Sequence, residues 1–187
     1  MNGFSEQIRN TISNIPYNEI FVASELKRTL LPEVTDTIFY KTLERMSKQN
    51  KLVHLTKGLY YRPMIAEGKV IPISEDIIVD YYVSGNAGAI IGEGFCIEKG
   101  ISKGFTKRME LISNKLAESK KHVGRIEIQK TDMKLDKEVI SVIQTLEVLQ
   151  NYSKLEKIDK HRFVSFLHDF VEDYSDEVTE YVLSNRT

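Results

Sequence analysis

The sequence predicts an α+β protein in which three short helices and a β-hairpin precede a larger mixed α/β region. Two observations predict this class. Helical periodicity in the first fifty residues gives way to alternation with period two, and the second half interleaves short apolar runs flanked by glycine with amphipathic helices. A length of 187 residues fits one large domain or two small ones.

The composition is that of a globular protein, with 41% hydrophobic and 28% charged residues. It is too apolar for wholesale disorder. The apolar runs are all shorter than the ~18 residues that cross a bilayer, and the N-terminus has neither the basic region nor the apolar stretch of a signal peptide. We therefore expect a cytoplasmic protein without membrane contact. Cys96 is the single cysteine, so disulfides within the chain are excluded.

Three helices are expected first. The segment 5–13 is followed by Pro16, and the segment 23–30 is followed by Pro32, which removes a backbone donor and closes the helix. Thr35 is the expected N-cap of a third helix that extends to Gln49. At 100° per residue, the apolar face of this helix comprises Ile38, Phe39, Thr42, Leu43 and Met46.

After Asn50 the period changes to two, which predicts a hairpin. The residues of one face are Val53, Leu55, Leu59 and Tyr61, and Lys57-Gly58 stands where the turn is expected. Three short helices followed by a hairpin is the element order of a winged helix-turn-helix. We therefore assign residues 1–64 to such a domain, with the third helix as its DNA-reading element.

The charge distribution favours DNA as the partner of this domain. The chain has a net charge of -1, but residues 41–62 hold six Lys or Arg and one Glu, a local excess of +5, and the acidic charge lies in the remainder. The alternatives are a solvated helix face and a winged helix that contacts protein. The residues expected to bind DNA are Thr37, Tyr40, Lys41, Arg45, Lys48, Lys51, His54, Lys57 and Arg62.

A second domain, residues 65–187, is expected to be mixed α/β with a helical C-terminus. The segment 64–72 reads as irregular chain. Expected helices cover 74–83, 94–101, 136–151, 159–174 and 176–184, and expected strands cover 89–91, 108–113 and 124–129. The last two helices carry an acidic face beside aromatic residues, a pattern that suits packing on the domain or docking of a basic partner.

Several motifs in this order resemble one protein family. Residues 57–63, Lys-Gly-Leu-Tyr-Tyr-Arg-Pro, resemble the wing end of proteins similar to AbiEi, an antitoxin of bacterial abortive-infection systems. Residues 88–93 with Gly100-Ile101-Ser102 resemble the family's strand-glycine-helix segment, 110–115 its "T-N-K" strand, and 125–128 the strand after it. The chain departs from the family at 103–106, where Lys-Gly-Phe-Thr replaces a segment resembling Thr-Gln-Val-Pro.

The resemblance implies the antitoxin of a type IV toxin-antitoxin pair. Such a protein represses its own operon through double-stranded operator DNA, and its second domain counteracts a nucleotidyltransferase-like toxin. The toxin is thus a functional partner, and direct contact with it is an open question. The other interpretation is a winged-helix regulator without a toxin partner, whose second domain dimerises or senses a ligand.

Enzyme chemistry finds no support in the sequence. The glycines at 85, 88, 92 and 94 precede no Gly-Lys-Ser/Thr, and they are explained by turns on either side of a short buried strand. The histidines at 54, 122, 161 and 168 form no array with zinc-ligand spacing. Neither a nucleophile elbow nor a cysteine-based centre is present, so we expect a non-enzyme without catalytic residues, cofactor or metal.

Overall fold

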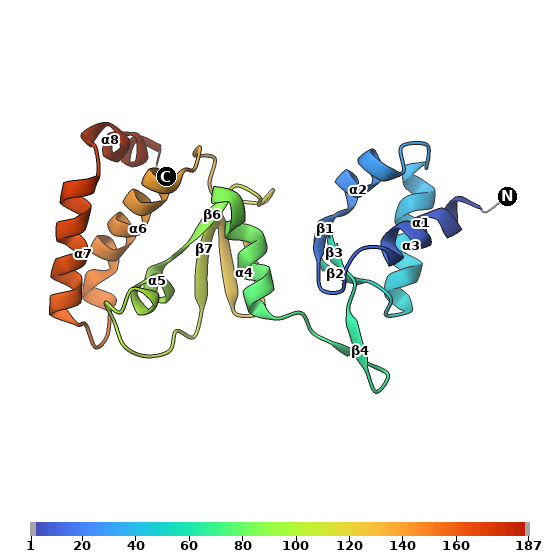
Figure 1. Ribbon diagram of the computed structural model, residues 1–187, viewed down its shortest axis with the longest axis horizontal. Helices are drawn as coiled ribbons and strands as arrows, with labels where there is room; N and C mark the ends of the chain where they lie inside the picture. Colours follow the sequence, from blue (N-terminus) through green and yellow to red (C-terminus); the bar gives the residue numbers. More distant parts are fainter. Residues whose placement is uncertain (1–2, 186–187) are drawn as a thin grey trace. The chain divides into compact units, whose positions relative to one another are not determined.

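The computed structural model describes residues 3–185, except for the side chains at positions 172 and 173 (Figure 1). The protein is mixed α and β, as expected, and it forms two compact units, of which the first ends at Ile78 and the second begins at Val79. The expected domain division at residues 64 and 65 stays a prediction. Within the described residues, the helices are all too short or too polar to cross a membrane.

Three helices enclose the core of the first unit: α1 (Phe4–Ser13), α2 (Ala23–Leu30) and α3 (Asp36–Lys48). All three were expected from helical periodicity and from the prolines that follow the first two. Their apolar faces meet because each has a stripe at helical spacing. The buried residues of this core are Ile8, Ile12, Ala23, Leu31, Val34, Phe39, Leu43, Met46 and Leu52.

A small antiparallel sheet completes the first unit. Its strands β1 (Ile20–Val22), β2 (Val53–Thr56) and β3 (Leu59–Tyr61) lie in the order β1-β3-β2. The turn between β2 and β3 contains Gly58 at φ +78, a backbone conformation that glycine adopts without strain. The expected hairpin is thus confirmed. The strand β1 was not expected, because three residues are too few to show alternation.

A second hairpin replaces the irregular segment expected over residues 64–72. Strands β4 (Met64–Ala66) and β5 (Lys69–Ile71) pair antiparallel. Between them, Glu67 and Gly68 both have positive φ, +52 and +74, as a two-residue type I′ turn requires. The interpretation of this segment as irregular was wrong, because the short strands have no buried face that would make the apolar pattern alternate.

The second unit is built on a four-stranded sheet. Its strands β6 (Gly88–Ile91), β7 (Met109–Ser113), β8 (Lys120–Val123) and β9 (Ile126–Lys130) lie in the order β6-β7-β9-β8. Strands β7 and β9 are parallel, whereas β6 and β8 are antiparallel to their neighbours. The edge strand β8 was not expected, because its sequence Lys-Lys-His-Val has no apolar alternation.

The helices of this part of the chain are α4 (Glu75–Val83), which spans the division between the units, α5 (Gly92–Glu98), α6 (Lys137–Asn151), α7 (Lys160–Asp173) and α8 (Asp176–Asn185), with single 3₁₀ turns at Ser84–Asn86 and Tyr152–Lys154. Helices α5 and α6 contact this sheet, and α7 and α8 contact α6 (Figure 1). The Asp136 side chain caps α6 by accepting a hydrogen bond of 2.9 Å from the Val139 amide. Apolar residues of α6 pack on β6 and β7, and Val182 of α8 joins the same core.

Candidate nucleic-acid interface

The outward face of α3 carries the side chains expected to bind DNA. Its apolar residues Phe39, Thr42, Leu43 and Met46 are buried. Helical geometry therefore turns the intervening positions to solvent, since they lie on the opposite side of the same helix. The exposed residues of this face include Thr37, Tyr40, Lys41, Arg45 and Lys48.

One carboxylate interrupts this cationic face. Glu44 Oε1 accepts a hydrogen bond of 2.7 Å from Lys48 Nζ, one helical turn further along. This hydrogen bond and the charge of Lys48 hold the pKa of Glu44 below its ordinary value of 4.5, and Arg45 and Lys41 lower that pKa further. Glu44 is therefore ionised at neutral pH and neutralises one of the three cations.

The β2–β3 hairpin adds polar groups near α3. The ring of His54, which is exposed, lies 4.8 Å from the ring of Tyr60. Burial raises the pKa of Tyr60, and Tyr40 of α3 raises it further by electrostatic repulsion. Lys57 is exposed at the hairpin turn, and Lys51 is exposed between α3 and β2.

Arg62 differs from the other eight expected DNA-binding residues because its guanidinium is turned inward. Its Nη1 donates hydrogen bonds to the carbonyls of Ser13, at 2.5 Å, and of Ile15. The guanidinium also lies 4.3 Å from the centre of the Tyr17 ring. Arg62 therefore ties the end of the hairpin to the segment that follows α1.

The structure adds residues that the sequence interpretation missed. A hollow of about 320 Å³ lies between α2 and α3 and is lined by Ser24, Lys27, Arg28, Pro32, Asp36 and Tyr40. Lys27 Nζ is paired with Asp36 at 2.9 Å, whereas the neighbouring Arg28 is exposed. Hydroxyl and guanidinium groups suit an anionic group such as a phosphate. The signal in the sequence is the pair of cations in the last turn of the second expected helix.

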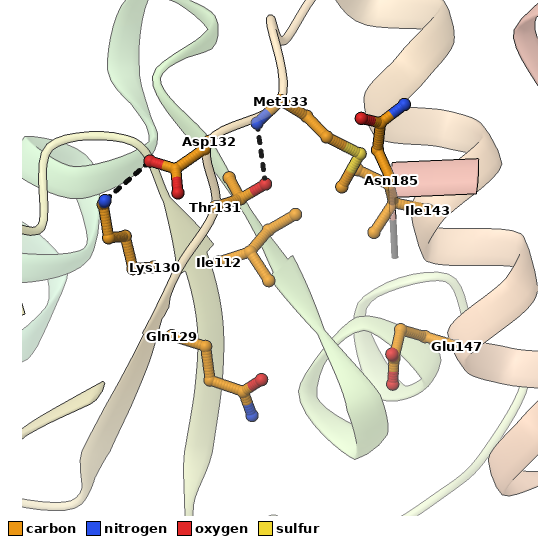
Figure 2. Close-up of a pocket in the computed structure, with 9 residues that line it drawn as sticks. All are labelled: Ile112, Gln129, Lys130, Thr131, Asp132, Met133, Ile143, Glu147 and Asn185. Atoms are coloured by element: carbon orange, nitrogen blue, oxygen red, sulfur yellow. Dashed lines mark hydrogen bonds and ion pairs between the residues drawn. The ribbon is translucent and has the colours of Figure 1, made fainter. Parts of the chain in front are cut away.

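The second unit contains a hollow of about 340 Å³ beside β9 and α6, whose lining residues are labelled in Figure 2. Lys130 Nζ is paired with Asp132 at 2.6 Å, and the Met133 amide donates a hydrogen bond of 3.2 Å to Thr131 Oγ1. Its lining therefore consists of satisfied polar groups and apolar side chains such as Ile112 and Ile143. This hollow shows neither an activated nucleophile nor a candidate proton-transfer pair.

Cys96 is buried in the second unit, whereas the four histidines lie on the surface. The Cys96 side chain is fully buried, and burial raises the pKa of its thiol to about 11, so it stays protonated. His54, His122, His161 and His168 are exposed. Over residues 3–185, the side chains that the structure describes include no group of three or more His, Cys, Asp or Glu placed to hold a metal ion.

No family model and no curated protein matches the sequence. Among solved structures, the chain is similar to the Rv2827c protein from Mycobacterium tuberculosis, with 13% sequence identity and a TM-score of 0.45. The similarity covers 98% of this chain and 72% of that chain. At this TM-score the similarity carries no information about the function of this chain.

Proposed function

We propose that the protein is a DNA-binding transcriptional regulator whose first unit is a winged helix. The observation that carries the proposal is the exposed face of α3, which presents Tyr40, Lys41 and Arg45 on a helix that shares a core with the β2–β3 hairpin. A helix of this kind fits the major groove, where Arg and Lys side chains recognise guanine. Hydroxyl groups can bind either base edges or phosphates.

The arrangement of elements supports this assignment. Helices α2 and α3 are consecutive, and we assign them as the helix-turn-helix, with β2 and β3 as the wing. The strand order β1-β3-β2 joins the wing to the segment between α1 and α2. In this proposal α3 reads bases, whereas Lys51, His54, Lys57 and the additional Arg28 bind phosphates. Arg62 positions the wing and does not contact DNA.

We further propose that the protein is the antitoxin of a type IV toxin-antitoxin pair. The resemblance of the wing end and of the motifs in the second unit supports this part. In this proposal, the first unit represses the operon and the second unit counteracts a nucleotidyltransferase-like toxin. A regulator without a toxin would instead use the second unit for dimerisation or ligand sensing. An adjacent gene encoding a nucleotidyltransferase-like toxin would favour the antitoxin.

DNA binding is tested with the full chain and its own upstream duplex by fluorescence anisotropy. Because neutralising phosphates releases counterions, affinity should fall steeply as salt rises. Lys41→Ala and Arg45→Ala should each cost about 1 to 3 kcal/mol and relax sequence preference, if these residues contact bases.

Two variants serve as matched controls. Glu44→Gln removes the carboxylate of the same face and should tighten binding, because it frees Lys48 for a phosphate. Arg9→Ala removes an exposed cation of α1 and should leave affinity unchanged. Binding without preference for the upstream duplex over an unrelated one at low salt would refute the repressor.

A further inference from the structure

The loop after α5 presents a fully exposed aromatic side chain. Phe105 is 97% exposed, the highest value among the large hydrophobic residues that the structure describes. A single exposed apolar side chain is ordinary on a protein surface, so the significance of this ring depends on the groups around it. This loop is also where the sequence departs from the AbiEi-like pattern, at residues 103–106.

Hydrogen bonds next to the ring hold the loop in this form. Thr106 Oγ1 donates a hydrogen bond of 2.5 Å to the Arg108 carbonyl and accepts one of 3.2 Å from the Arg108 amide. Arg125 Nη1 donates a hydrogen bond of 3.3 Å to the Thr106 carbonyl. The ring of Phe105 is therefore presented to solvent by an anchored backbone.

Several cations lie close to Phe105 in the sequence. Residues 99–108 contain four Lys or Arg and no Asp or Glu. Arg125 joins them because β7 and β9 are parallel and begin at the same end of the sheet, immediately after Arg108 and Arg125. The sequence after residue 64 is acidic overall, so this local run of cations stands out. Arg108 is paired with Glu127, which leaves the three lysines as the cations of the run without an ion pair among the described residues.

A hollow of about 390 Å³ opens beside the ring. Its lining combines Phe105, Thr106, Lys107 and Arg108 with the carboxylates of Glu93, Glu110 and Glu156. Carboxylates accept hydrogen bonds from the exocyclic amino groups of bases, as they do from the N4 group of cytosine. The same carboxylates repel a phosphate. The hollow can therefore bind a base, and the cations of the loop can bind the sugar-phosphate backbone.

We propose that this loop and hollow bind single-stranded nucleic acid. One base stacks on Phe105 with its amino edge toward Glu93, Glu110 and Glu156, and Lys103 and Lys107 bind the flanking phosphates. Arg125 holds the loop through the Thr106 carbonyl. Stacking on an aromatic ring beside cations that follow the backbone is the general mode of binding to single strands.

The isolation of the ring favours nucleic acid over a protein partner. A protein interface has an apolar core made of several side chains. Of the described residues that line the hollow, Phe105 is the one apolar side chain, and the others are charged or polar. A base needs a single ring face and nearby cations, which is what this loop provides.

The test uses the full chain and short labelled homopolymers of deoxycytidine, cytidine and deoxythymidine, measured by anisotropy. We expect the cytosine strands to bind roughly fivefold more tightly than deoxythymidine, which lacks the amino group. The deoxycytidine and cytidine strands together determine whether DNA or RNA is preferred.

Phe105→Ala should weaken binding about tenfold, because one stacked base is lost. Lys107→Ala should reduce the slope of log K against log salt by about 0.7.

Val171→Ala is the matched control, because it truncates another highly exposed apolar side chain and should change nothing. Cross-linking of a strand containing 5-iodouracil, mapped by mass spectrometry, should place the cross-link at Phe105. Circular dichroism checks that each variant is folded. Unchanged affinity in a folded Phe105→Ala variant, or cross-links confined to residues 36–62, would overturn the proposal. Equal binding of a polyglutamate peptide, lost with Phe105→Ala, would also overturn it and indicate an acidic protein partner.

Discussion

Arg62 shows how a single contact changes the role of a residue. It lies directly after β3, where a cation would be expected to reach the DNA backbone, yet its guanidinium binds the carbonyls that follow α1. Charge-assisted hydrogen bonds to backbone carbonyls contribute more than neutral ones because the donor is ionised. Arg62 therefore stabilises the first unit.

The first prediction concerns this residue. Arg62→Ala should lower the free energy of unfolding by about 1.5 to 3 kcal/mol, because it leaves two carbonyls without their charged donor. Urea denaturation provides the measurement. Lys57→Ala, an exposed change at the hairpin turn, should stay within about 0.5 kcal/mol of the wild type. Equal stability of the two variants would contradict this role for Arg62.

Glu110 and Glu127 are paired in register across β7 and β9, but their surroundings differ. Glu127 is almost fully buried and is bonded to Lys120 and, at 2.8 Å, to Arg108. The hydrogen bond from Lys120 is the main cause that holds the pKa of Glu127 below 4.5. Burial, followed by repulsion from Glu127 and Glu147, raises the pKa of Glu110 above 4.5.

The second prediction follows from these opposite directions. A lowered pKa means that Glu127 stabilises the fold above its unfolded-state pKa near 4.5, and that this stability is lost as pH falls through the lower folded value. Glu127→Gln should therefore cost about 1 to 3 kcal/mol at neutral pH. A raised pKa means that ionisation of Glu110 lowers the free energy of unfolding. This loss grows as pH rises from about 4.5, the unfolded-state value, through the higher pKa of the folded state.

Glu110→Gln should consequently stabilise the protein at neutral pH and have little effect below pH 4.5. Thermal unfolding of both variants over a pH series measures the two effects. A decrease in stability of the folded Glu110→Gln variant at neutral pH would contradict this prediction. It would show that favourable contacts of the carboxylate outweigh the free-energy cost of burying its charge.

At the scale of elements, β6 depends on close approach of backbones. A Cβ added at Gly88 would lie 2.2 Å from the Ile112 carbonyl oxygen and 2.6 Å from that of Tyr82. Ser113 Oγ lies in the same region within hydrogen-bond distance of two carbonyl oxygens that can share its proton, those of Tyr82, at 2.8 Å, and Ala87, at 2.9 Å. Only glycine fits here, because the neighbouring atoms belong to backbone and cannot rotate away.

The third prediction compares two glycines of this segment. Gly88→Ala should cost about 3 kcal/mol or more, since the strand must shift to relieve the overlap. Gly85→Ala faces open space and carries only the strain of its φ of +68, about 1 kcal/mol. Chemical denaturation of both variants measures the difference, and similar costs would contradict the close approach at β6.

At the scale of the whole molecule, each unit has a core of its own. Ile143 is buried among residues of β6, β7, α6 and α8, all in the second unit. The first core is formed by residues up to Leu52. The two proposed activities, reading of duplex DNA by α3 and opposition to a toxin by the second unit, should therefore be separable.

The fourth prediction uses this separation. Ile143→Asp would bury an unpaired charge, at a cost of several kcal/mol against a total stability of about 5 to 15. We expect this variant to lose protection against the neighbouring toxin in a survival assay but to retain duplex binding. A fragment of residues 74–187, which keeps α4 whole, should protect without binding the upstream duplex. Protection that requires the first unit would place antitoxin activity there.

The sequence by itself determined the elements whose signals are local. The helices over 23–30, 36–48 and 137–151 follow from apolar spacing and capping residues close in the chain, and the β2–β3 hairpin follows from alternation around Lys57-Gly58. The exposed face of α3 is predictable for the same reason. A helix fixes which side chains share a face whatever surrounds it.

The tertiary structure alone decided features that depend on distant segments. Strands β1 and β8 and the parallel pairing of β7 with β9 exist through partners elsewhere in the chain. The inward turn of Arg62 needs the carbonyls of Ser13 and Ile15, and the place of Arg125 beside the Phe105 loop needs two strands that begin at one end of a sheet. Local periodicity contains no information on such contacts, because pairing partners, burial and charge clusters are set by packing between residues far apart in sequence.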